Sequence, residues 1–269
     1  MNITVQDALP LLQCPESKSA LHIEGDFLVN EVGARYPIRE GIIDLVKEDK
    51  QDQNQIVETG YNKLESLKYH LFVLNPPWLT FLWGFGFLKT PMYMLKLLEV
   101  PTGWVLDVPC GSGIFSMPIY KSNPRTKFIA IDYSIEMLKS AKLRAKKKGI
   151  DNVVFIRADV ADLPFIENTI AGALSFAGFH AFPDPLAAGL EIGRVLQNDS
   201  PILMTAACRG IRCISDYMID KYLIPNGYFS NGLTVEKYSS FLEDAGIKKL
   251  QVNMAGAFMI AKGYKTSKL

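Results

Sequence analysis

The sequence is poor in the residues that build covalent or metal-held scaffolds. Its 269 residues include four cysteines and three histidines, and no Cys-x-x-Cys pair occurs. This pattern gives no disulfide framework and favours a reducing intracellular setting, so we expect a cytoplasmic protein. The net charge is also close to zero, at +1, because 29 basic residues stand against 28 acidic residues. Such a balance gives no long-range attraction to a polyphosphate, so we expect no nucleic-acid partner.

The sequence also lacks an uninterrupted apolar run long enough to span a bilayer. Residues 71–88 carry no charge over 18 positions, but Asn75, Pro76 and Pro77 interrupt them. The eleven residues that remain are too few, because a spanning helix needs about 20. We expect a buried or substrate-covering helix here, and an interfacial patch resting on a bilayer is the alternative. The first residues lack the basic and apolar stretches of a signal peptide.

From residue 90 onward the sequence alternates between strand-like and helix-like segments. Seven strand candidates, most of them separated by helical patterns, lie at residues 104–108, 126–133, 152–159, 170–179, 201–207, 248–256 and 257–265. This alternation predicts an α/β fold with a doubly wound, Rossmann-like sheet of seven strands. Most of these strands should be parallel, and the last two should form an antiparallel C-terminal hairpin.

The chain divides into a small module and a large domain. Residues 1–50 contain short strand candidates separated by glycines, which predicts a small β-rich module. The large domain is expected to span residues 57–269. Two insertions in it, near 65–98 and 208–232, are rich in aromatic residues and are expected to cover the functional site.

Acidic residues stand where three of the predicted strands end, at Asp107, Asp132 and Asp159. Ligands of such sheets bind at the carboxyl ends of the strands, so these carboxylates should converge. They would repel the pyrophosphate of a dinucleotide. The loop after Asp107 also departs from the G-x-G-x-x-G pattern, because Ser116 stands in the place of the third glycine. A cationic ligand that carries hydrogen-bond donors fits better, and S-adenosylmethionine is such a ligand.

Each part of that ligand has a candidate partner in the sequence. Gly111 and Gly113 let the backbone approach the methionine part closely. Asp132 can accept hydrogen bonds from both ribose hydroxyls, and Asp159 can accept one from the adenine amine. Asp107 can favour the α-ammonium group, directly or through water.

Five segments, in order and spacing, resemble the motifs of class I S-adenosylmethionine-dependent methyltransferases: VLDVPCGSG, IAIDYSIEMLKSA, FIRADVADLPF, FHAFPDP and EIGRVLQ. The branch that they resemble most is that of the ubiquinone/menaquinone C-methyltransferases and certain uncharacterised plastid methyltransferases. The resemblance covers residues 61–264 and implies a methyltransferase that releases S-adenosylhomocysteine. The cofactor-binding residues that it implies, together with those argued above, are Tyr61, Asp107, Pro109, Cys110, Gly111, Ser112, Gly113, Asp132, Tyr133, Met137, Asp159, Val160, Phe176 and Ala177.

The N-terminal module resembles the small zinc ribbon that precedes some methyltransferases, including the rRNA guanine-N1 enzymes. Here Cys14-Pro15 is followed by Glu16 and Ser17, and no second cysteine pair appears. One thiolate cannot form a tetrahedral zinc site, so we expect no bound metal. An rRNA-type methyltransferase remains an alternative function, as does a non-catalytic protein that binds S-adenosylmethionine.

The aromatic insertions favour a small, largely apolar acceptor that is methylated at oxygen or carbon. The candidate acceptor contacts are Trp83, Tyr93, Arg209 and Tyr217. His180 follows the fourth strand of the main domain and is the candidate general base. Its alternative role is a histidine that only packs under the cover. The sequence does not predict the oligomeric state.

Overall fold

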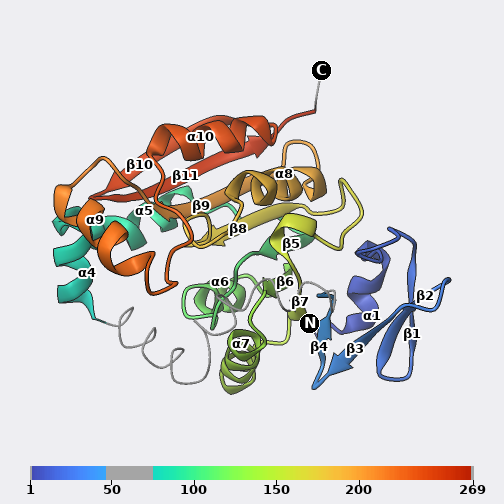
Figure 1. Cartoon of the computed structure of the whole chain (residues 1–269). Helices are drawn as coiled ribbons and strands as arrows, with labels where there is room; N and C mark the ends of the chain where they lie inside the picture. Colours follow the sequence, from blue (N-terminus) through green and yellow to red (C-terminus); the bar gives the residue numbers. More distant parts are fainter. Residues whose placement is uncertain (1, 47–74, 268–269) are drawn as a thin grey trace.

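A computed structural model describes residues 2–46 and 75–267, and they form one sheet with helices on both faces (Figure 1). In this part of the chain the strand order is β1-β2-β3-β4-β7-β6-β5-β8-β9-β11-β10. The strands are β1 (Leu21–Glu24), β2 (Phe27–Asn30), β3 (Arg35–Arg39), β4 (Ile42–Asp44), β5 (Trp104–Asp107), β6 (Lys127–Asp132), β7 (Val153–Arg157), β8 (Gly172–Phe176), β9 (Pro201–Ala207), β10 (Ile247–Ala255) and β11 (Phe258–Lys265).

The seven predicted strands form the predicted doubly wound sheet. Strands β7, β6, β5, β8 and β9 are parallel neighbours, and β11 pairs antiparallel with both β9 and β10. Every residue of β7, β8 and β9 is buried, as expected for parallel strands that are covered on both faces. The predicted α/β fold and its C-terminal hairpin are confirmed.

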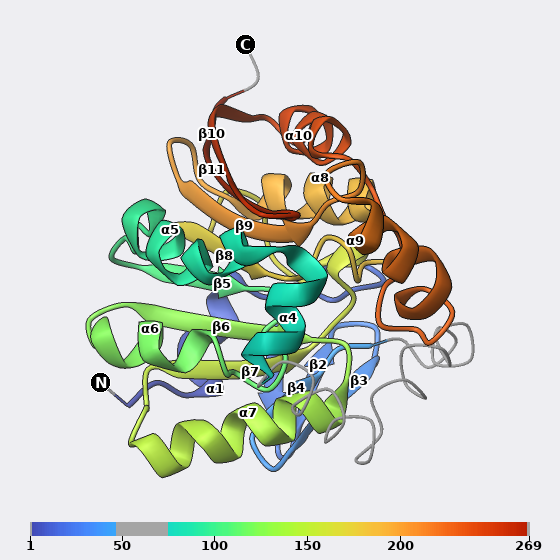
Figure 2. The ribbon, with the colours of Figure 1, turned by 90° about the vertical axis from the view of Figure 1, so that its left-hand side faces the viewer.

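Two layers of helices cover this sheet (Figure 2). On one face lie α5 (Thr90–Leu97), α6 (Ser116–Ser122) and α7 (Ile135–Lys148). On the other lie α8 (Pro185–Val195) and α10 (Val235–Asp244).

Local sequence sets the ends of these helices. The Ser134 side chain accepts a hydrogen bond from the backbone N–H of Met137 at the start of α7, and Gly149 ends that helix in the left-handed conformation. Asp184 caps α8 in the same way, and Pro185 takes its first position.

Residues 21–44 form the four strands β1–β4, in keeping with the expected β-rich character of the N-terminal module, and these strands extend the main sheet. Strand β4 pairs in parallel with β7, with Ile43 opposite Ile156. This pairing covers an apolar strand that would otherwise be an exposed sheet edge. Ahead of these strands lie α1 (Val5–Ala8) and the 3-10 helix η1 (Leu9–Leu11).

Cys14 is buried in the N-terminal module. Its sulfur lies 3.2 Å from the Tyr36 hydroxyl and 3.2 Å from Asn30 Nδ2. Within residues 2–46 and 75–267 no three His, Cys, Asp or Glu side chains gather as a group that could hold a metal ion. Cys14 thus lies among polar side chains of its own module, and the resemblance of that module to a zinc ribbon stays a prediction.

The described parts of the two insertions pack against each other. The first contains α4 (Pro76–Trp83), the 3-10 helix η3 (Phe85–Lys89) and α5, and the second contains α9 (Cys213–Met218) and the π-helix η5 (Ile219–Leu223). The Ser215 hydroxyl donates to the Leu82 carbonyl at 2.6 Å, which joins α9 to α4. No helix in the described ranges is long and apolar enough to cross a membrane.

Candidate active site

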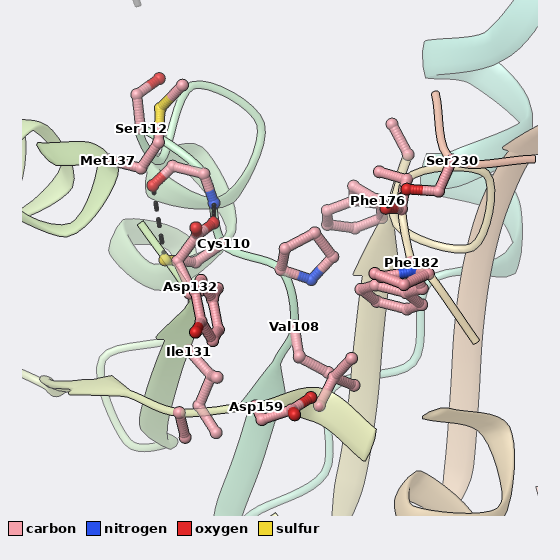
Figure 3. Close-up of a pocket in the computed structure, with 18 of the residues that line it drawn as sticks. Val108, Cys110, Ser112, Ile131, Asp132, Met137, Asp159, Phe176, Phe182 and Ser230 are labelled. Carbon is pink, nitrogen blue, oxygen red and sulfur yellow. Dashed lines mark hydrogen bonds between the residues drawn. The ribbon is translucent and has the colours of Figure 1, made fainter. Parts of the chain in front are cut away.

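A cavity of about 570 Å³ opens at the carboxyl ends of β5, β6, β7 and β8 (Figure 3). This is the edge at which open α/β sheets bind their ligands, and the volume suits a small-molecule site. Eleven of the predicted cofactor residues line it: Pro109, Cys110, Gly111, Ser112, Asp132, Tyr133, Met137, Asp159, Val160, Phe176 and Ala177. Tyr61 lies outside the described residues.

The loop after β5 is held against the end of β6 by its own backbone. The Cys110 N–H donates to the Ile131 carbonyl at 2.7 Å, and the Gly111 N–H donates to Asp132 Oδ2 at 2.8 Å. Gly111 has a φ of +53°, and a Cβ built there would meet nothing within 4 Å. The loop therefore leaves open space beside Gly111, where a ligand can approach the backbone.

Gly113 has a different role from the one expected. A Cβ at this position would lie 2.4 Å from Met117 Cε, and its φ is +75°. The glycine allows the loop to pack on α6, and it does not line the cavity. Cys110 is buried, and burial raises the pKa of its thiol well above the usual value. The thiol therefore stays protonated at neutral pH and is unreactive.

Asp132 faces the cavity with both carboxylate oxygens already oriented (Figure 3). Oδ2 accepts from the Gly111 N–H, and Oδ1 accepts from the Ser134 N–H at 2.9 Å. The Tyr133 backbone also stabilises this carboxylate, and the two oxygens together retain acceptor capacity for a ligand. Burial raises the pKa of Asp132 to about 6, although these backbone donors lower it.

Asp107 does not line the cavity, although the next residue, Val108, does; of the two expected routes to an ammonium group, direct or through water, the route through water fits this position better. The residue is 0% exposed, and its Oδ2 accepts from the Tyr120 hydroxyl at 2.5 Å. Its Oδ1 is buried and forms no hydrogen bond of good geometry among the described residues, although the nearby Ser116 side chain acts to lower the pKa of the carboxyl. Burial raises the pKa of this carboxyl to about 7. Such a group can be satisfied by a buried water or by a cation at the cavity floor.

Asp159 follows the end of β7 by two residues and caps a short helix. Its Oδ1 accepts from the Ala161 N–H at 2.9 Å, which caps the 3-10 helix η4 (Val160–Asp162). Like Asp132, it lines the cavity. Two of the three predicted carboxylates thus share the cavity, and the third, Asp107, is fully buried outside its lining.

The opposite side of the cavity is apolar and was largely missed from sequence. Phe176, Phe182 and Ser230 lie across the cavity from Asp132 (Figure 3). Ile224 and Phe229 complete this side from the insertion after β9. The sequence signals were the aromatic content of that insertion and of the FHAFPDP motif, but neither showed which side chains point inward.

Gly178 allows the loop after β8 to pack closely against the loop after β5. A Cβ on this residue would lie 2.4 Å from Pro109 Cδ and 2.8 Å from Phe182 Cζ. The loop after β8 can therefore lie against the cofactor loop only with glycine here. Ala177, the residue before it, has a φ of +56°, which side chains rarely adopt. Ala177 and Gly178 directly follow β8, and their conformation turns the chain at the end of that strand.

His180 does not face the cavity, which corrects its expected place beside an acceptor. The ring is 5% exposed, and its Nδ1 accepts from the Ala207 N–H at 3.1 Å. Burial lowers the pKa of His180 to about 3, so the ring is neutral. Its centroid lies 4.0 Å from that of Phe229, and its carbonyl accepts from the Ser230 N–H at 3.0 Å. The histidine thus holds the segment that forms the apolar side.

The four candidate acceptor contacts also lie away from the cavity. Trp83 is 3% exposed and stacks on Phe229 at 6.0 Å, so it belongs to the core behind the cavity wall. Tyr93 packs against the core under α5. Arg209 pairs with an aspartate of its own insertion, and Tyr217 is 60% exposed. The insertions do form a wall, but through residues other than those expected.

A chain of contacts links the N-terminal strands to the cavity. Asp44 of β4 pairs with Arg157 of β7, with 3.2 Å between Oδ2 and Nη1. The Arg157 Nε donates to the Tyr133 carbonyl at 2.8 Å, and the guanidinium lies 5.4 Å from the Tyr133 ring centroid. Because Tyr133 lines the cavity, Asp44 supports a cavity wall from outside the predicted main domain.

Comparison with known proteins supplies the family context. Residues 101–246 match the model of a family described as Methyltransferase domain. An uncharacterized chloroplastic methyltransferase of Arabidopsis thaliana is 36% identical over 125 residues, which are 44% of this chain and 35% of that protein. A demethylmenaquinone methyltransferase of Porphyromonas gingivalis is 27% identical over 161 residues, 59% of this chain and 63% of that protein. The match thus spans about a third of the chloroplastic relative.

Solved structures share the fold. A Thermotoga maritima protein described as an S-adenosylmethionine-dependent methyltransferase, possibly acting on histamine, has a TM-score of 0.59 at 18% identity, covering 79% of this chain and 99% of its own. A Haemonchus contortus phosphoethanolamine N-methyltransferase, solved with S-adenosylhomocysteine and phosphomonomethylethanolamine, has a TM-score of 0.59 at 12% identity, covering 84% of this chain and 62% of its own. At these identities the likeness shows the fold alone.

Proposed function

The chain belongs to the methyltransferase domain family, and on this premise we propose that it transfers a methyl group from S-adenosylmethionine to a small, largely apolar acceptor at oxygen or carbon. S-adenosylmethionine is the cofactor of this family and fold. The acceptor class rests on one observation, the apolar side of the cavity formed by Phe176, Phe182 and Phe229. The ring of a quinone-like or phenolic molecule suits such walls, and the activity of the Porphyromonas relative supports that choice.

The residues present fit the cofactor. Asp132 and Asp159 offer acceptor lone pairs to ribose hydroxyls and to an amine, and both line the cavity. Asp107 precedes the cavity-lining residue Val108, and its buried Oδ1 could favour an ammonium group in the cavity through a bridging water. The open space beside Gly111 admits the methionine part close to the backbone.

When bound, the cofactor would supply an electrophilic methyl group: the acceptor atom forms a bond to the methyl carbon in line with sulfur, the methyl–sulfur bond breaks, and S-adenosylhomocysteine leaves as a neutral thioether. The chain contributes alignment, through the carboxylates on one side and the aromatic wall on the other. It also excludes water, because Phe182 and Phe229 border the space that the acceptor would fill. His180 is neutral and bonded through Nδ1, so the geometry favours an acceptor that needs no histidine base.

Turnover on extracted metabolites tests the acceptor class. Labelled S-adenosylmethionine is offered with lipid-extractable metabolites and, separately, with total RNA, at low and moderate salt. We expect label in the small-molecule fraction with little salt dependence, since apolar burial does not release counterions. RNA binding would instead weaken by orders of magnitude between about 50 and 200 mM salt. Methylation confined to RNA with that dependence would favour the rRNA-type alternative, and no transfer at all would favour a non-catalytic binding protein.

Cofactor binding is expected to strengthen as the pH rises. The raised pKa values, about 7 for Asp107 and about 6 for Asp132, mean that both carboxyls are partly protonated in the free protein at pH 6. A cation requires the ionised forms, so the Kd for S-adenosylmethionine should be about twentyfold higher near pH 6 than near pH 8. Calorimetry across this range measures it, and a Kd that does not change with pH would contradict the prediction.

The raised pKa values of Asp107 and Asp132 also determine how the free energy of unfolding changes with pH. Carboxyls whose pKa is raised in the folded state bind protons more tightly there than in the unfolded chain. The free energy of unfolding of the ligand-free protein should therefore fall as the pH rises from about 4 to about 7. Thermal unfolding should show this fall, and Asp107→Asn should reduce it.

Asp44→Asn is expected to weaken the binding of S-adenosylhomocysteine about threefold to tenfold, or about 0.6–1.4 kcal/mol. The change weakens the ion pair that fixes Arg157, and with it the position of Tyr133. Glu24→Gln is the matched control, because Glu24 pairs with Arg35 on the same sheet extension at 58% exposure. A lowered melting temperature with an unchanged Kd would show that Asp44 is only structural.

A further inference from the structure

A stripe of large apolar side chains lies exposed along η3 and α5. Phe85, Leu88, Met92 and Leu95 are 84%, 59%, 55% and 73% exposed. Their spacing of three, four and three residues places them on one side of a helical segment. We call these four residues the apolar stripe.

The opposite side of the same segment is fully used by the core. Leu97 is 7% exposed, and Tyr93 and Met94 pack against the buried cluster beneath α5. The segment is therefore apolar on two sides. One side is covered by the protein core, and the other is exposed to solvent. Since exposed contiguous apolar surface of this kind marks a contact site, the uncovered side requires an occupant.

The charges around the stripe identify that occupant. Lys89 and Lys96 directly follow Leu88 and Leu95, so they lie about 120° around the 3-10 helix and about 100° around α5 from them, and both are exposed. No acidic residue occurs from residue 75 to residue 98. Apolar side chains flanked by lysines are typical of helices that lie in an anionic membrane surface. Lysine is depleted at protein–protein interfaces, so a protein partner fits less well.

The neighbouring helix extends the same side of the molecule. In Figure 2, α4 and α5 both face the viewer, joined by η3. Phe81 of α4 is 55% exposed and stacks with Trp78 at 5.8 Å. Aromatic rings and lysines beside an apolar stripe match the layering of a bilayer interface.

We infer that the apolar stripe, with Lys89 and Lys96, docks the protein on the surface of an anionic lipid bilayer. The apolar side chains enter the boundary between headgroups and acyl chains, and the two ammonium groups meet lipid phosphates. The inference stands independently of the proposed methyl acceptor, because it uses no residue of the cavity.

Vesicle flotation of the full chain tests the inference. The probes are phosphatidylcholine vesicles with and without phosphatidylglycerol. We expect the chain to bind the anionic vesicles, and the variant F85S/L95Q to bind at least about tenfold more weakly, since two large apolar side chains no longer leave water. K89Q/K96Q should lose the preference for anionic over neutral vesicles.

Two matched variants separate a specific contact from general stickiness. V32Q removes an apolar side chain that is 80% exposed elsewhere, after β2. K146Q/K147Q removes exposed charge from the more basic end of α7. Both should bind vesicles as the unaltered chain does. Loss of binding in K146Q/K147Q, with F85S/L95Q unaffected, would overturn the inference.

The remaining alternative to lipid binding is that the apolar stripe contacts a second copy of the chain. If sedimentation shows a dimer that F85S/L95Q dissociates, and no vesicle binds, then the stripe contacts a second copy and the lipid inference fails. Cofactor affinity and methyl transfer to a soluble acceptor should be the same in F85S/L95Q as in the unaltered chain. Failure of the lipid inference is therefore distinguishable from failure of the proposed function.

Discussion

Replacing Trp83 by alanine is expected to lower the free energy of unfolding by about 3–5 kcal/mol. The indole is 3% exposed and lies between Phe229 at 6.0 Å and Phe258 at 6.1 Å. Its removal leaves a cavity between the two insertions and β11, which the surrounding helices can fill only in part. Urea unfolding followed by circular dichroism measures the loss.

Phe81→Ala is the matched control for this prediction. Phe81 lies two residues earlier on α4 and is 55% exposed, so its loss should change stability by no more than about 0.5 kcal/mol. If Trp83→Ala left stability nearly unchanged and raised the KM for an acceptor, Trp83 would be a cover residue, as the sequence alone suggested. The stacking on Phe229 predicts the opposite.

The central fold could be predicted because its signals are local. The strands from β5 to β9 are largely apolar runs, two of which end at an aspartate, and capping residues such as Ser134 and Asp184 fix where helices start. The joining of β4 to β7 could not be predicted. It pairs Ile43 with Ile156, more than a hundred residues apart, and nothing near either residue specifies the other.

The candidate site, like the fold, has some features that could be predicted from the sequence and others that could not. The convergence of Asp132 and Asp159 follows from strand topology, because parallel strands end at one edge. Which aromatic side chains of the insertions face the cavity could not be predicted from the sequence. Aromatic residues without a clear helical or strand period can face either the cavity or the core behind it. Trp83 and Phe229 therefore looked alike in sequence, yet only Phe229 lines the cavity. His180 was misplaced because its partner, the Ala207 N–H, lies on another strand end.

Asp132→Ala is expected to weaken S-adenosylhomocysteine binding by about 1.5–3 kcal/mol, roughly tenfold to 150-fold in Kd. The carboxylate lines the cavity and holds the Gly111 N–H, so the change removes the expected ribose acceptor and also releases the cofactor loop. Asp132→Asn keeps one oxygen and should lose less. Calorimetry with S-adenosylhomocysteine and with NAD measures both affinities, and NAD is expected not to bind.

Asp162→Ala is the control for the carboxylate change. Asp162 lies a few residues beyond the end of β7, pairs with Lys18 and does not line the cavity, so its variant should bind S-adenosylhomocysteine normally. Circular dichroism of each variant establishes that it is folded before binding is measured, because the lost cap on the Ser134 N–H also affects the start of α7. An unchanged Kd in folded Asp132→Ala, or tight NAD binding by the unaltered chain, would contradict the assignment of Asp132 to the ribose of S-adenosylmethionine.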